Sequence, residues 1–355
     1  MKLSRIGESG LIDRLTGGLS QGPEVIRGVG DDTAVLQVDQ EKWLLFTTDM
    51  LVEGVHFSLD YCAPDEVGWK LLAVSVSDVA AMGGRPTHAV ISLAIPERLS
   101  VVQMESLYQG LKEAAAEYRV NLVGGDTVSA KDSLVLNLAL LGEAPAGQVV
   151  YRRGAQPGDV VCLTGSLGAS AAGLFLFQHP AVTCSRKAAD YCRQAHAKPR
   201  PDAEAGILLA GLGATAMNDI SDGLAAEIME ICTAGEVGCN LREGDLPIDP
   251  RVWKVAATAA AEFLRLPGGA GRDSAIAETA GIFARRWALY GGEDFKLVFT
   301  LPAKKLKAAR QAAKEQGLTI YQVGTIRAGS GITLEKPDGS LIPLLRGGYE
   351  HFVSK

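Results

Sequence analysis

The stretch Gly28-Val29-Gly30-Asp31-Asp32-Thr33 decides how this chain is interpreted, because it places glycines and paired carboxylates directly before two strand-like runs. The runs are 34–38 and 43–46, and Thr47-Thr48-Asp49 and a short loop to His56 follow the second one. Oxygen groups beside glycines at the end of a sheet suit Mg²⁺ and phosphate, since Mg²⁺ prefers oxygen ligands and glycine lets the backbone approach a ligand. Taken alone, Asp31 and Asp32 are better explained as a simple turn.

Three further stretches place Asp or Glu beside glycine at an expected strand or helix junction. They are Gly124-Gly125-Asp126-Thr127, Asn218-Asp219-Ile220-Ser221-Asp222-Gly223 and Gly291-Gly292-Glu293-Asp294, and Asp49 and Asp78 add two isolated carboxylates. Independent turns explain this repetition poorly. A shared site for several Mg²⁺ ions is the more economical interpretation, because Mg²⁺ binds few carboxylates and completes its shell with water and phosphate oxygens.

Individual acidic residues keep a second interpretation. Asp78 falls in the last turns of a helix that we expect to begin at Pro64 and stop at Gly83, where a carboxylate opposes the helix dipole. It is therefore either a solvated helix-end charge or a ligand. Asp222 could cap the helix expected over 224–233, whereas Asp219 and Ser221 point to one side of an extended chain.

Composition limits the class of protein. The chain has 355 residues, which suggests two domains, and its net charge of −6 argues against nucleic acid as a partner. No apolar run is long enough to span a bilayer, so we expect no membrane partner, and the start of the chain lacks the apolar core of a secretion signal. We therefore expect a cytoplasmic protein. The six cysteines are scattered without a Cys-x-x-Cys pair, and the histidines show no metal-ligand spacing.

The composition changes around 145–158, a stretch rich in Pro, Gly and Arg, and we place the domain boundary there. We expect an N-terminal domain over 1–148 and a C-terminal domain over 149–355. The second domain begins with a strand over 160–164 and the turn Gly165-Ser166-Leu167-Gly168 before a helix, which is a plausible anion cradle. Residues 266–275 read as a loose loop, and Pro337-Asp338-Gly339 as the turn of a hairpin.

An acidic protein with several metal sites suggests phosphoryl transfer, which needs alignment and charge compensation more than covalent chemistry. The chain carries neither a Walker A sequence nor the glycine loop and His-Arg-Asp of protein kinases. If it uses ATP, it holds the phosphates by another device.

The motifs together resemble the thiamine-monophosphate kinase family of the aminoimidazole-ribonucleotide synthetase superfamily. They are Gly30-Asp31-Asp32, Thr47-Thr48-Asp49, His56-Phe57, Ser77-Asp78-Val79-Ala80-Ala81-Met82-Gly83, Gly124-Gly125-Asp126-Thr127, Asp219-Ile220-Ser221-Asp222-Gly223-Leu224 and Gly291-Gly292-Glu293-Asp294-Phe295. The resemblance spans nearly the whole chain in the right order. It implies an α/β (α+β) fold of two domains, with an N-terminal mixed sheet that forms a barrel across a homodimer and a C-terminal α/β domain that completes the active site.

The resemblance also implies a reaction and a set of residues. ATP, bound between the domains with several Mg²⁺ ions, would phosphorylate thiamine monophosphate to thiamine diphosphate. Metal ligands, direct or through water, would be Asp32, Thr47, Thr48, Asp49, Asp78, Asp126, Asp219 and Asp222; residues contacting ATP would be Tyr108, Gly125, Asp126, Arg152 and Ser221. His56 and Glu293 would bind the substrate, where a carboxylate suits a cationic thiazolium. Without the resemblance, His56 reads as a packed or surface histidine and Glu293 as a charge at a strand edge.

The tail departs from the family pattern. Some members carry a tryptophan near the C-terminal Gly-Tyr-x-His-Phe, but here Arg346 and two glycines precede Tyr349, which becomes the candidate for stacking on the substrate. The 266–275 loop is also longer and richer in glycine than expected.

Rival functions exist inside and outside the family. An aminoimidazole-ribonucleotide synthetase remains an alternative enzyme; a selenophosphate synthetase would need a reactive Cys in residues 1–30, which hold none. A hydrogenase maturation partner would end in a Cys, whereas this chain ends Phe-Val-Ser-Lys. A non-catalytic binding protein would not need so many oxygen ligands.

We expect direct in-line transfer without a phospho-enzyme. The acceptor phosphate has a second pKa of about 6, so it is ionised near neutral pH and needs no general base. The motifs offer oxygen ligands and glycines but no clear covalent nucleophile.

Overall fold

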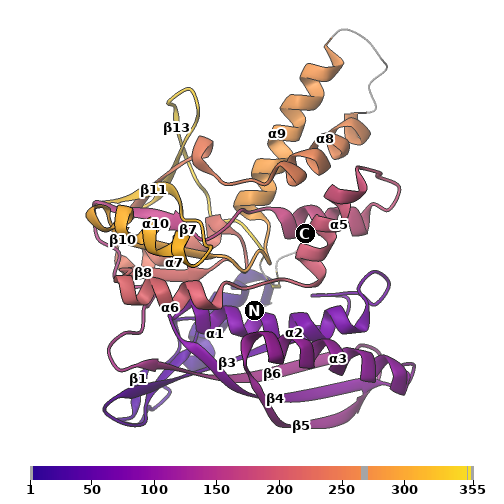
Figure 1. Ribbon diagram of the computed structural model, residues 1–355, viewed down its shortest axis with the longest axis vertical. Coiled ribbons are helices and arrows are strands. Elements are labelled where there is room, and N and C mark those ends of the chain that lie inside the picture. Colours follow the sequence, from indigo (N-terminus) through magenta and orange to yellow (C-terminus); the bar gives the residue numbers. More distant parts are fainter. Residues whose placement is uncertain (1–2, 265–270, 350, 353–355) are drawn as a thin grey trace.

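Two β-sheets with flanking helices organise the chain in the computed structural model, which describes residues 3–264, 271–349 and 351–352. Figure 1 shows an N-terminal part below and a C-terminal part above, with helices α2 (Pro64–Ala81) and α6 (Ala203–Leu212) where the two parts meet. Both sheets contain parallel and antiparallel pairs. The expected α/β architecture with a mixed N-terminal sheet is confirmed.

The N-terminal sheet has six strands in the order β1-β2-β3-β6-β4-β5. Its part of the chain contains η1 (Leu3–Arg5), α1 (Gly7–Thr16), β1 (Val25–Arg27), β2 (Ala34–Gln37), β3 (Lys42–Val52), α2, β4 (Arg85–Pro96), α3 (Val101–Tyr118), β5 (Asn121–Ala130) and β6 (Val135–Pro145). Side chains alternate along β3: Leu45 and Leu51 are buried beneath α2, whereas Phe46 and Met50 are exposed on the other face. One face of this sheet therefore carries the helices, and the other is open in the single chain.

The C-terminal sheet has seven strands in the order β13-β12-β9-β11-β7-β10-β8. Its part contains β7 (Asp159–Leu163), α4 (Ala169–Gln178), α5 (Arg186–Ala197), α6, β8 (Ala216–Asp219), α7 (Leu224–Gly235), β9 (Gly238–Arg242), η2 (Glu243–Asp245), α8 (Pro250–Leu264), α9 (Arg272–Tyr290), β10 (Leu297–Pro302), η3 (Ala303–Lys305), α10 (Leu306–Glu315), β11 (Tyr321–Arg327), β12 (Ile332–Glu335) and β13 (Leu341–Pro343). The neighbouring strands β7 and β10 are buried almost throughout and lie toward the β8 edge.

Helix α2 brings the two parts together. It begins with Pro64 in its first turn and Glu66 bonded back to Ala63 N, and it ends before Gly83, whose φ of +74° favours glycine. Almost every residue from Val67 to Ala81 is buried, because α2 packs on the N-terminal sheet on one side and against α6 and β8 on the other. The last turns of α2 thus lie where both parts of the chain can reach them.

Two strands are longer than the sequence indicates. We expected β3 to end at Thr47–Asp49 and β5 to end before Gly124, but β3 continues to Val52 and β5 to Ala130. In both cases the partner strand continues and supplies main-chain hydrogen bonds, which outweighs the local turn preference of Gly and Asp. Asp49 and Asp126 therefore lie inside strands.

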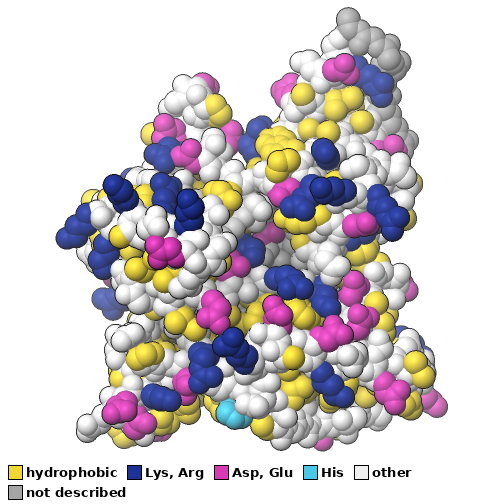
Figure 2. All heavy atoms as spheres, in the orientation of Figure 1, with side chains coloured by type: hydrophobic (Ala, Val, Ile, Leu, Met, Phe, Trp, Pro, Cys, Tyr) yellow, Lys and Arg dark blue, Asp and Glu magenta, His cyan; other side chains and the backbone are white. Residues whose placement is uncertain are grey.

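The expected loop over 266–275 is partly a helix. Residues 266–270 lie outside the described residues, but Gly271 precedes α9, which begins at Arg272. Helices α8 and α9 pack side by side and project beyond the second sheet (Figure 1). Figure 2 shows a notch in the surface between this pair and the β12–β13 hairpin. Within the described residues, no helix combines the length and the apolar character that crossing a membrane demands.

Candidate active site

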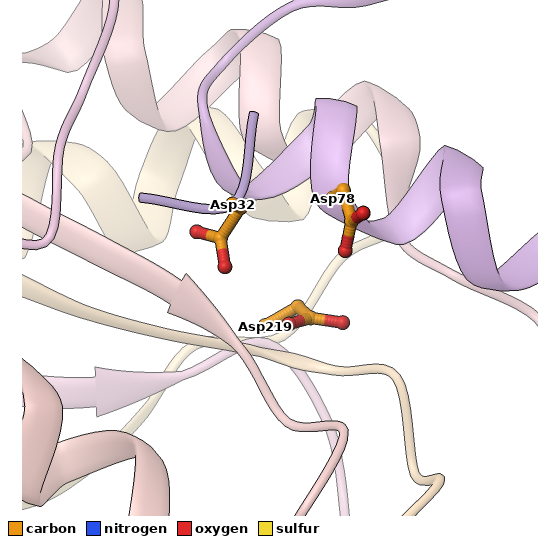
Figure 3. Close-up of side chains that lie close together, drawn as sticks. All are labelled: Asp32, Asp78 and Asp219. Carbon is orange, nitrogen blue, oxygen red and sulfur yellow. The ribbon is translucent and has the colours of Figure 1, made fainter. Parts of the chain in front are cut away.

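Three carboxylates from distant parts of the chain meet between the two sheets. Asp32 lies in the turn before β2, Asp78 in the last turn of α2 and Asp219 at the end of β8, and one oxygen of each lies within 4.8 Å of the others. Figure 3 shows the three side chains converging on a common space. We call Asp32, Asp78 and Asp219 the carboxylate cluster.

The cluster is electrostatically strained without a cation. Burial raises the pKa of Asp32 to about 7 and that of Asp219 to about 6, and burial with the neighbouring carboxylates raises the pKa of Asp78 well above its usual value. Asp32 Oδ2 is buried with no hydrogen-bond partner among the described residues. An uncompensated buried anion is costly, so this donor set suits a divalent cation.

Hydroxyl groups orient the acidic side chains. Thr47 Oγ1 donates to Asp78 Oδ2 over 2.6 Å, and Ser77 Oγ donates to Asp219 Oδ2 over 2.7 Å. Ser75 Oγ donates over 2.6 Å to Asp49 Oδ2, whose pKa burial raises. The two serines lie two residues apart on α2, and each of them holds one carboxylate.

Thr47 and Asp49 share the face of β3 that points toward α2, and alternation places Thr48 on the other face. The Thr48 hydroxyl donates to Leu138 O and accepts from the amide of Asn137, both on the neighbouring strand. Of the three residues in this motif, the structure brings Thr47 and Asp49 to the cluster and turns the Thr48 side chain away from it.

Asp31 and Asp32 have separate surroundings. Asp31 accepts from Arg27 Nε at 2.5 Å and from the main-chain N of Arg152 at 2.8 Å, and so fixes the turn. Asp32 faces the cluster and pairs with Arg152, whose guanidinium nitrogen lies 2.5 Å from Asp32 Oδ1. The guanidinium also pairs with Glu230 at 2.5 Å. The turn interpretation therefore applies to Asp31, whereas Asp32 lies in the carboxylate cluster.

The Ser221–Asp222 loop rests on a buried glutamate that the sequence analysis did not single out. Glu227 Oε2 accepts from Asn218 Nδ2 over 2.7 Å, and Oε1 accepts from Asp222 N over 2.9 Å. Ser221 Oγ lies 3.4 Å from the same Oε1. The signal was present in the sequence, since Glu227 lies on the inward face of α7 one residue before buried Ile228.

Asp222 does not cap α7. Gly223, at a φ of +112°, is the residue before the helix, and no side-chain cap is present there. Burial, with Glu8 and Glu230 nearby, raises the pKa of Asp222 to about 7. The interpretation of Asp222 as a helix cap is therefore wrong, and its carboxyl remains available to a cation.

His56, Glu293 and the C-terminal tail gather at one end of the site. The rings of His56 and His351 lie 5.4 Å apart, and the ring of Tyr349 lies 4.9 Å from that of His351. The main-chain N of Tyr349 donates to Asp222 O over 3.2 Å, which ties the tail to the acidic loop. Glu293 contacts Lys70 and His196, two buried residues that the sequence analysis did not identify because each lies alone within a helix.

Three expected site residues do not reach the cluster in the single chain. Asp126 and Gly125 lie on the exposed edge strand β5. A Cβ at position 125 would lie 2.0 Å from Ile91 O, so glycine here permits the close approach of β4. Tyr108 is partly buried on α3 and packs against the core of the N-terminal part.

The expected anion cradle before α4 already holds an anion of the chain itself. Asp294 accepts from the main-chain N of Gly168 over 2.6 Å and of Ser170 over 3.2 Å. The first amides of α4 are thus occupied by a side chain. This segment supports the loop carrying Glu293 and does not offer a phosphate site.

Comparison with known proteins finds a family and several similar proteins. The models of the AIR synthase related protein N-terminal and C-terminal domains match residues 30–144 and 156–336. A thiamine-monophosphate kinase of Bacillus subtilis (strain 168) is 35% identical over 328 residues, which cover 92% of this chain and 93% of the relative. A solved structure described as AaThiL complexed with AMPPCP and TMP is 31% identical, with a TM-score of 0.80 and 99% of both chains covered.

A more distant solved structure, E. coli HypE, a hydrogenase maturation protein, is 19% identical with a TM-score of 0.64 over 96% of this chain and 98% of that one. At this identity the likeness shows a shared fold alone.

Proposed function

The chain belongs to the AIR synthase related family and is a thiamine-phosphate kinase, and we propose that it transfers the γ-phosphoryl of ATP directly to the phosphate of thiamine monophosphate with the help of several Mg²⁺ ions. The related structure described with AMPPCP and TMP supports this pair of substrates, since AMPPCP is an analogue of ATP. The product is thiamine diphosphate, and a cytoplasmic location, where ATP is supplied, is part of the same proposal.

The carboxylate cluster is the observation that carries the proposal. Two polyanions and several buried carboxylates repel one another, and a bound divalent cation supplies the positive charge that lets them approach. Asp32, Asp78 and Asp219 would hold such ions, with Asp49 and Asp222 beside them and the Thr47 hydroxyl fixing Asp78. The unpartnered Asp32 Oδ2 fits this role. Thr48 would take part only through its main chain, because its hydroxyl points away from the cluster and donates to Leu138 O.

Other residues of this chain bind and orient the two substrates. In the proposal Arg152, Ser221, Gly125, Asp126 and Tyr108 serve ATP, and Arg152 can exchange its ion pairs with Asp32 and Glu230 for phosphate oxygens once cations neutralise the acids. Glu293 faces the cationic thiazolium, and His56 and Tyr349 contact the acceptor. Val52 N donates to His56 Nδ1 over 3.0 Å, so the Nε2–H of His56 is the donor that remains.

The N-terminal domain, proposed over residues 1–148, would bind ATP and metal and would form the dimer. The C-terminal domain, over 149–355, would complete the active site. The origin of the cluster supports this division, because Asp32 and Asp78 come from the first range and Asp219 from the second.

A homodimer with a barrel formed from both N-terminal sheets is part of the proposal. The open face of this sheet exposes Phe46, Met50, Val90 and Val128, each between 43% and 54% exposed, and large exposed apolar faces mark association surfaces. A second copy on this face would cover them and remove the exposed edge β5. It would also account for Asp126, which does not reach the cluster of its own chain.

The transfer proceeds in one step in this proposal. The acceptor phosphate is ionised near neutral pH, since its second pKa is about 6, so no general base is required. Cys62, Cys162, Cys192, Cys232 and Cys239 are buried, and burial raises the pKa of the Cys62 thiol to about 11, which makes it a poor nucleophile. Changing Asp49 or Asp126 to Ala should thus reduce the rate far more than any Cys→Ser change.

Two experiments test the proposal. Purified protein with ATP, Mg²⁺ and thiamine monophosphate should give thiamine diphosphate and ADP by chromatography, and excess EDTA should abolish the product; full turnover in EDTA would refute the metal requirement. Enzyme incubated with γ-labelled ATP alone and then quenched should carry no label. Stoichiometric labelling that chases into thiamine diphosphate would rule out direct transfer.

A further inference from the structure

Lys70 is a buried cation in the middle of α2. It is 1% exposed and lies between the buried residues Trp69 and Leu71. Lysine is seldom fully buried unless it is paired, because an ammonium loses its hydration there. The carboxylate cluster and its supporting hydroxyl groups do not include Lys70, so its burial needs another explanation.

The ammonium of Lys70 connects two distant segments. Its Nζ lies 2.8 Å from Glu293 Oε1 and donates to the main-chain O of His56 over 3.2 Å. His56 follows β3 in the N-terminal part, and Glu293 precedes β10 in the C-terminal part. A single side chain thus fixes both groups that are proposed to bind the acceptor.

The rest of the structure holds Glu293 toward Lys70. Glu293 and Phe295 have φ values of +64° and +47°, backbone conformations that non-glycine residues keep only where the surroundings impose them. The main-chain N of Glu293 donates to Ser221 O over 2.7 Å, and that of Phe295 donates to Ile220 O over 2.9 Å. The strained turn and its main-chain bonds together aim the carboxylate across the two parts.

His196 contacts the other carboxylate oxygen of Glu293. Its Nδ1 lies 3.1 Å from Glu293 Oε2 and 3.1 Å from Ser170 Oγ. Burial and the nearby Lys70 lower the pKa of His196, so the ring is neutral near pH 7 and Lys70 supplies the positive charge. Burial raises the pKa of Glu293, but Lys70 and His196 outweigh it and lower the pKa to about 2, so the carboxylate is charged at working pH.

We propose that Lys70 is a positioning residue for the acceptor, whose ammonium holds the His56 segment and the Glu293 carboxylate at a fixed spacing across the two parts of the chain. This inference rests on the proposed roles of His56 and Glu293 in acceptor binding. Lys70 itself does not touch the reacting phosphates; it acts through the two residues that it holds.

The test compares Lys70→Met, Glu293→Gln and the double variant in steady-state kinetics with each substrate varied in turn. Lys70→Met should raise the KM for thiamine monophosphate about tenfold or more, because small misplacements of binding groups are amplified, and should leave the KM for ATP within about twofold. Lys112→Met, which removes an exposed lysine from α3, is the matched control and should change neither constant.

The double variant separates positioning from a general effect on stability. If Lys70 acts through Glu293, Lys70→Met should add little, within about twofold in acceptor KM, to Glu293→Gln, because coupled residues are not additive. Additive effects would overturn the proposal. So would an unchanged or lower acceptor KM in Lys70→Met, since the ammonium would then merely compete with the cationic thiazolium for Glu293.

The outcomes also distinguish this inference from the proposed role of Glu293. A raised acceptor KM in Glu293→Gln with none in Lys70→Met would refute the positioning role alone. An unchanged acceptor KM in Glu293→Gln would refute the role of Glu293 and the positioning role with it. If Lys70→Met fails to fold by circular dichroism, the acceptor KM of the double variant, which removes both charges, is compared with that of Glu293→Gln. A difference of no more than about twofold is again the expected result.

Discussion

Ser77 Oγ donates a hydrogen bond to Asp219 Oδ2 over 2.7 Å, and both residues are buried. The bond joins the end of α2 in the N-terminal part to the end of β8 in the C-terminal part. It therefore fixes one carboxylate of the cluster relative to another, Asp78, which is the next residue along α2.

Ser77→Ala should weaken metal binding without removing a ligand. A hydrogen bond to a charged acceptor contributes about 1.5–3 kcal/mol, so we expect the Mg²⁺ concentration for half-maximal activity to rise at least about tenfold. The measurement is initial rate against Mg²⁺ concentration. Thr258→Ala, which removes a hydroxyl bonded to Lys254 O on α8, is the control. An unchanged Mg²⁺ requirement in Ser77→Ala would show that Asp219 needs no such support.

Asp78→Asn should stabilise the metal-free protein and reduce its activity. Burial and repulsion from Asp49, Asp219 and Asp32 raise the pKa of Asp78. A neutral side chain at this position should therefore reduce the charge repulsion in the metal-free protein at pH 8. We expect a higher midpoint of thermal unfolding in EDTA and a loss of rate of about a hundredfold or more. Asp132→Asn, at an exposed position between β5 and β6, should leave the midpoint in EDTA unchanged. A lower midpoint in Asp78→Asn would mean that the carboxylates do not repel one another.

Sequence reasoning recovered the members of the cluster but not their supports. Asp32, Asp78 and Asp219 each stand beside glycine or small residues in a motif, so local chemistry marks them. Lys70 and Glu227 lie alone on buried helix faces, where a charge is explained only by its partners in the folded chain. These are Glu293, far away in sequence, for Lys70 and Asn218, on the preceding strand β8, for Glu227. No local pattern encodes such partners.

The strand ends were misjudged for a related reason. Gly124-Gly125-Asp126-Thr127 has the composition of a turn, yet β4 runs alongside and supplies main-chain partners up to Ala130. Tertiary pairing thus overrides local propensity. The same effect hides the face on which a side chain lies, as with Thr48, until the register is known.

The stability of the metal-free protein should fall as pH rises from about 5 to 8. The folded-state pKa values of Asp32, Asp219 and Asp222 are raised to between about 6 and 7, so the folded protein binds more protons than the unfolded chain in this range. Stability from these groups is present at low pH and is lost as pH rises through those values. His56 and His196 act oppositely, because their lowered pKa values cost stability below about pH 6.5.

Mg²⁺ should therefore stabilise the protein more at pH 8 than at pH 6. The measurement is the thermal midpoint with EDTA and with saturating Mg²⁺ across this range, in the absence of nucleotide. A gain that shrinks as pH rises would contradict the assignment of these carboxylates to a cation site.

Asp126 should complete the active site of a partner chain. Within one chain Asp126 pairs with Ser92 on β4, Ser92 with Asn137 on β6, and Asn137 with Met50 on β3, so these side chains lie on the open face of the sheet. Asp49, next to Met50, faces α2 instead. Three strand spacings, about 14 Å, also separate β5 from β3. In the proposed homodimer, Asp49 of one chain and Asp126 of the other then serve one site.

Asp49→Ala and Asp126→Ala should each be inactive alone. When they are unfolded and refolded together in equal amounts, half of the dimers are mixed, and each mixed dimer has one intact site, so about a quarter of wild-type activity should return. Sedimentation verifies that the mixture is dimeric. If both residues served the site of their own chain, no mixed dimer would hold an intact site, and the absence of recovered activity in a dimeric mixture would refute this arrangement.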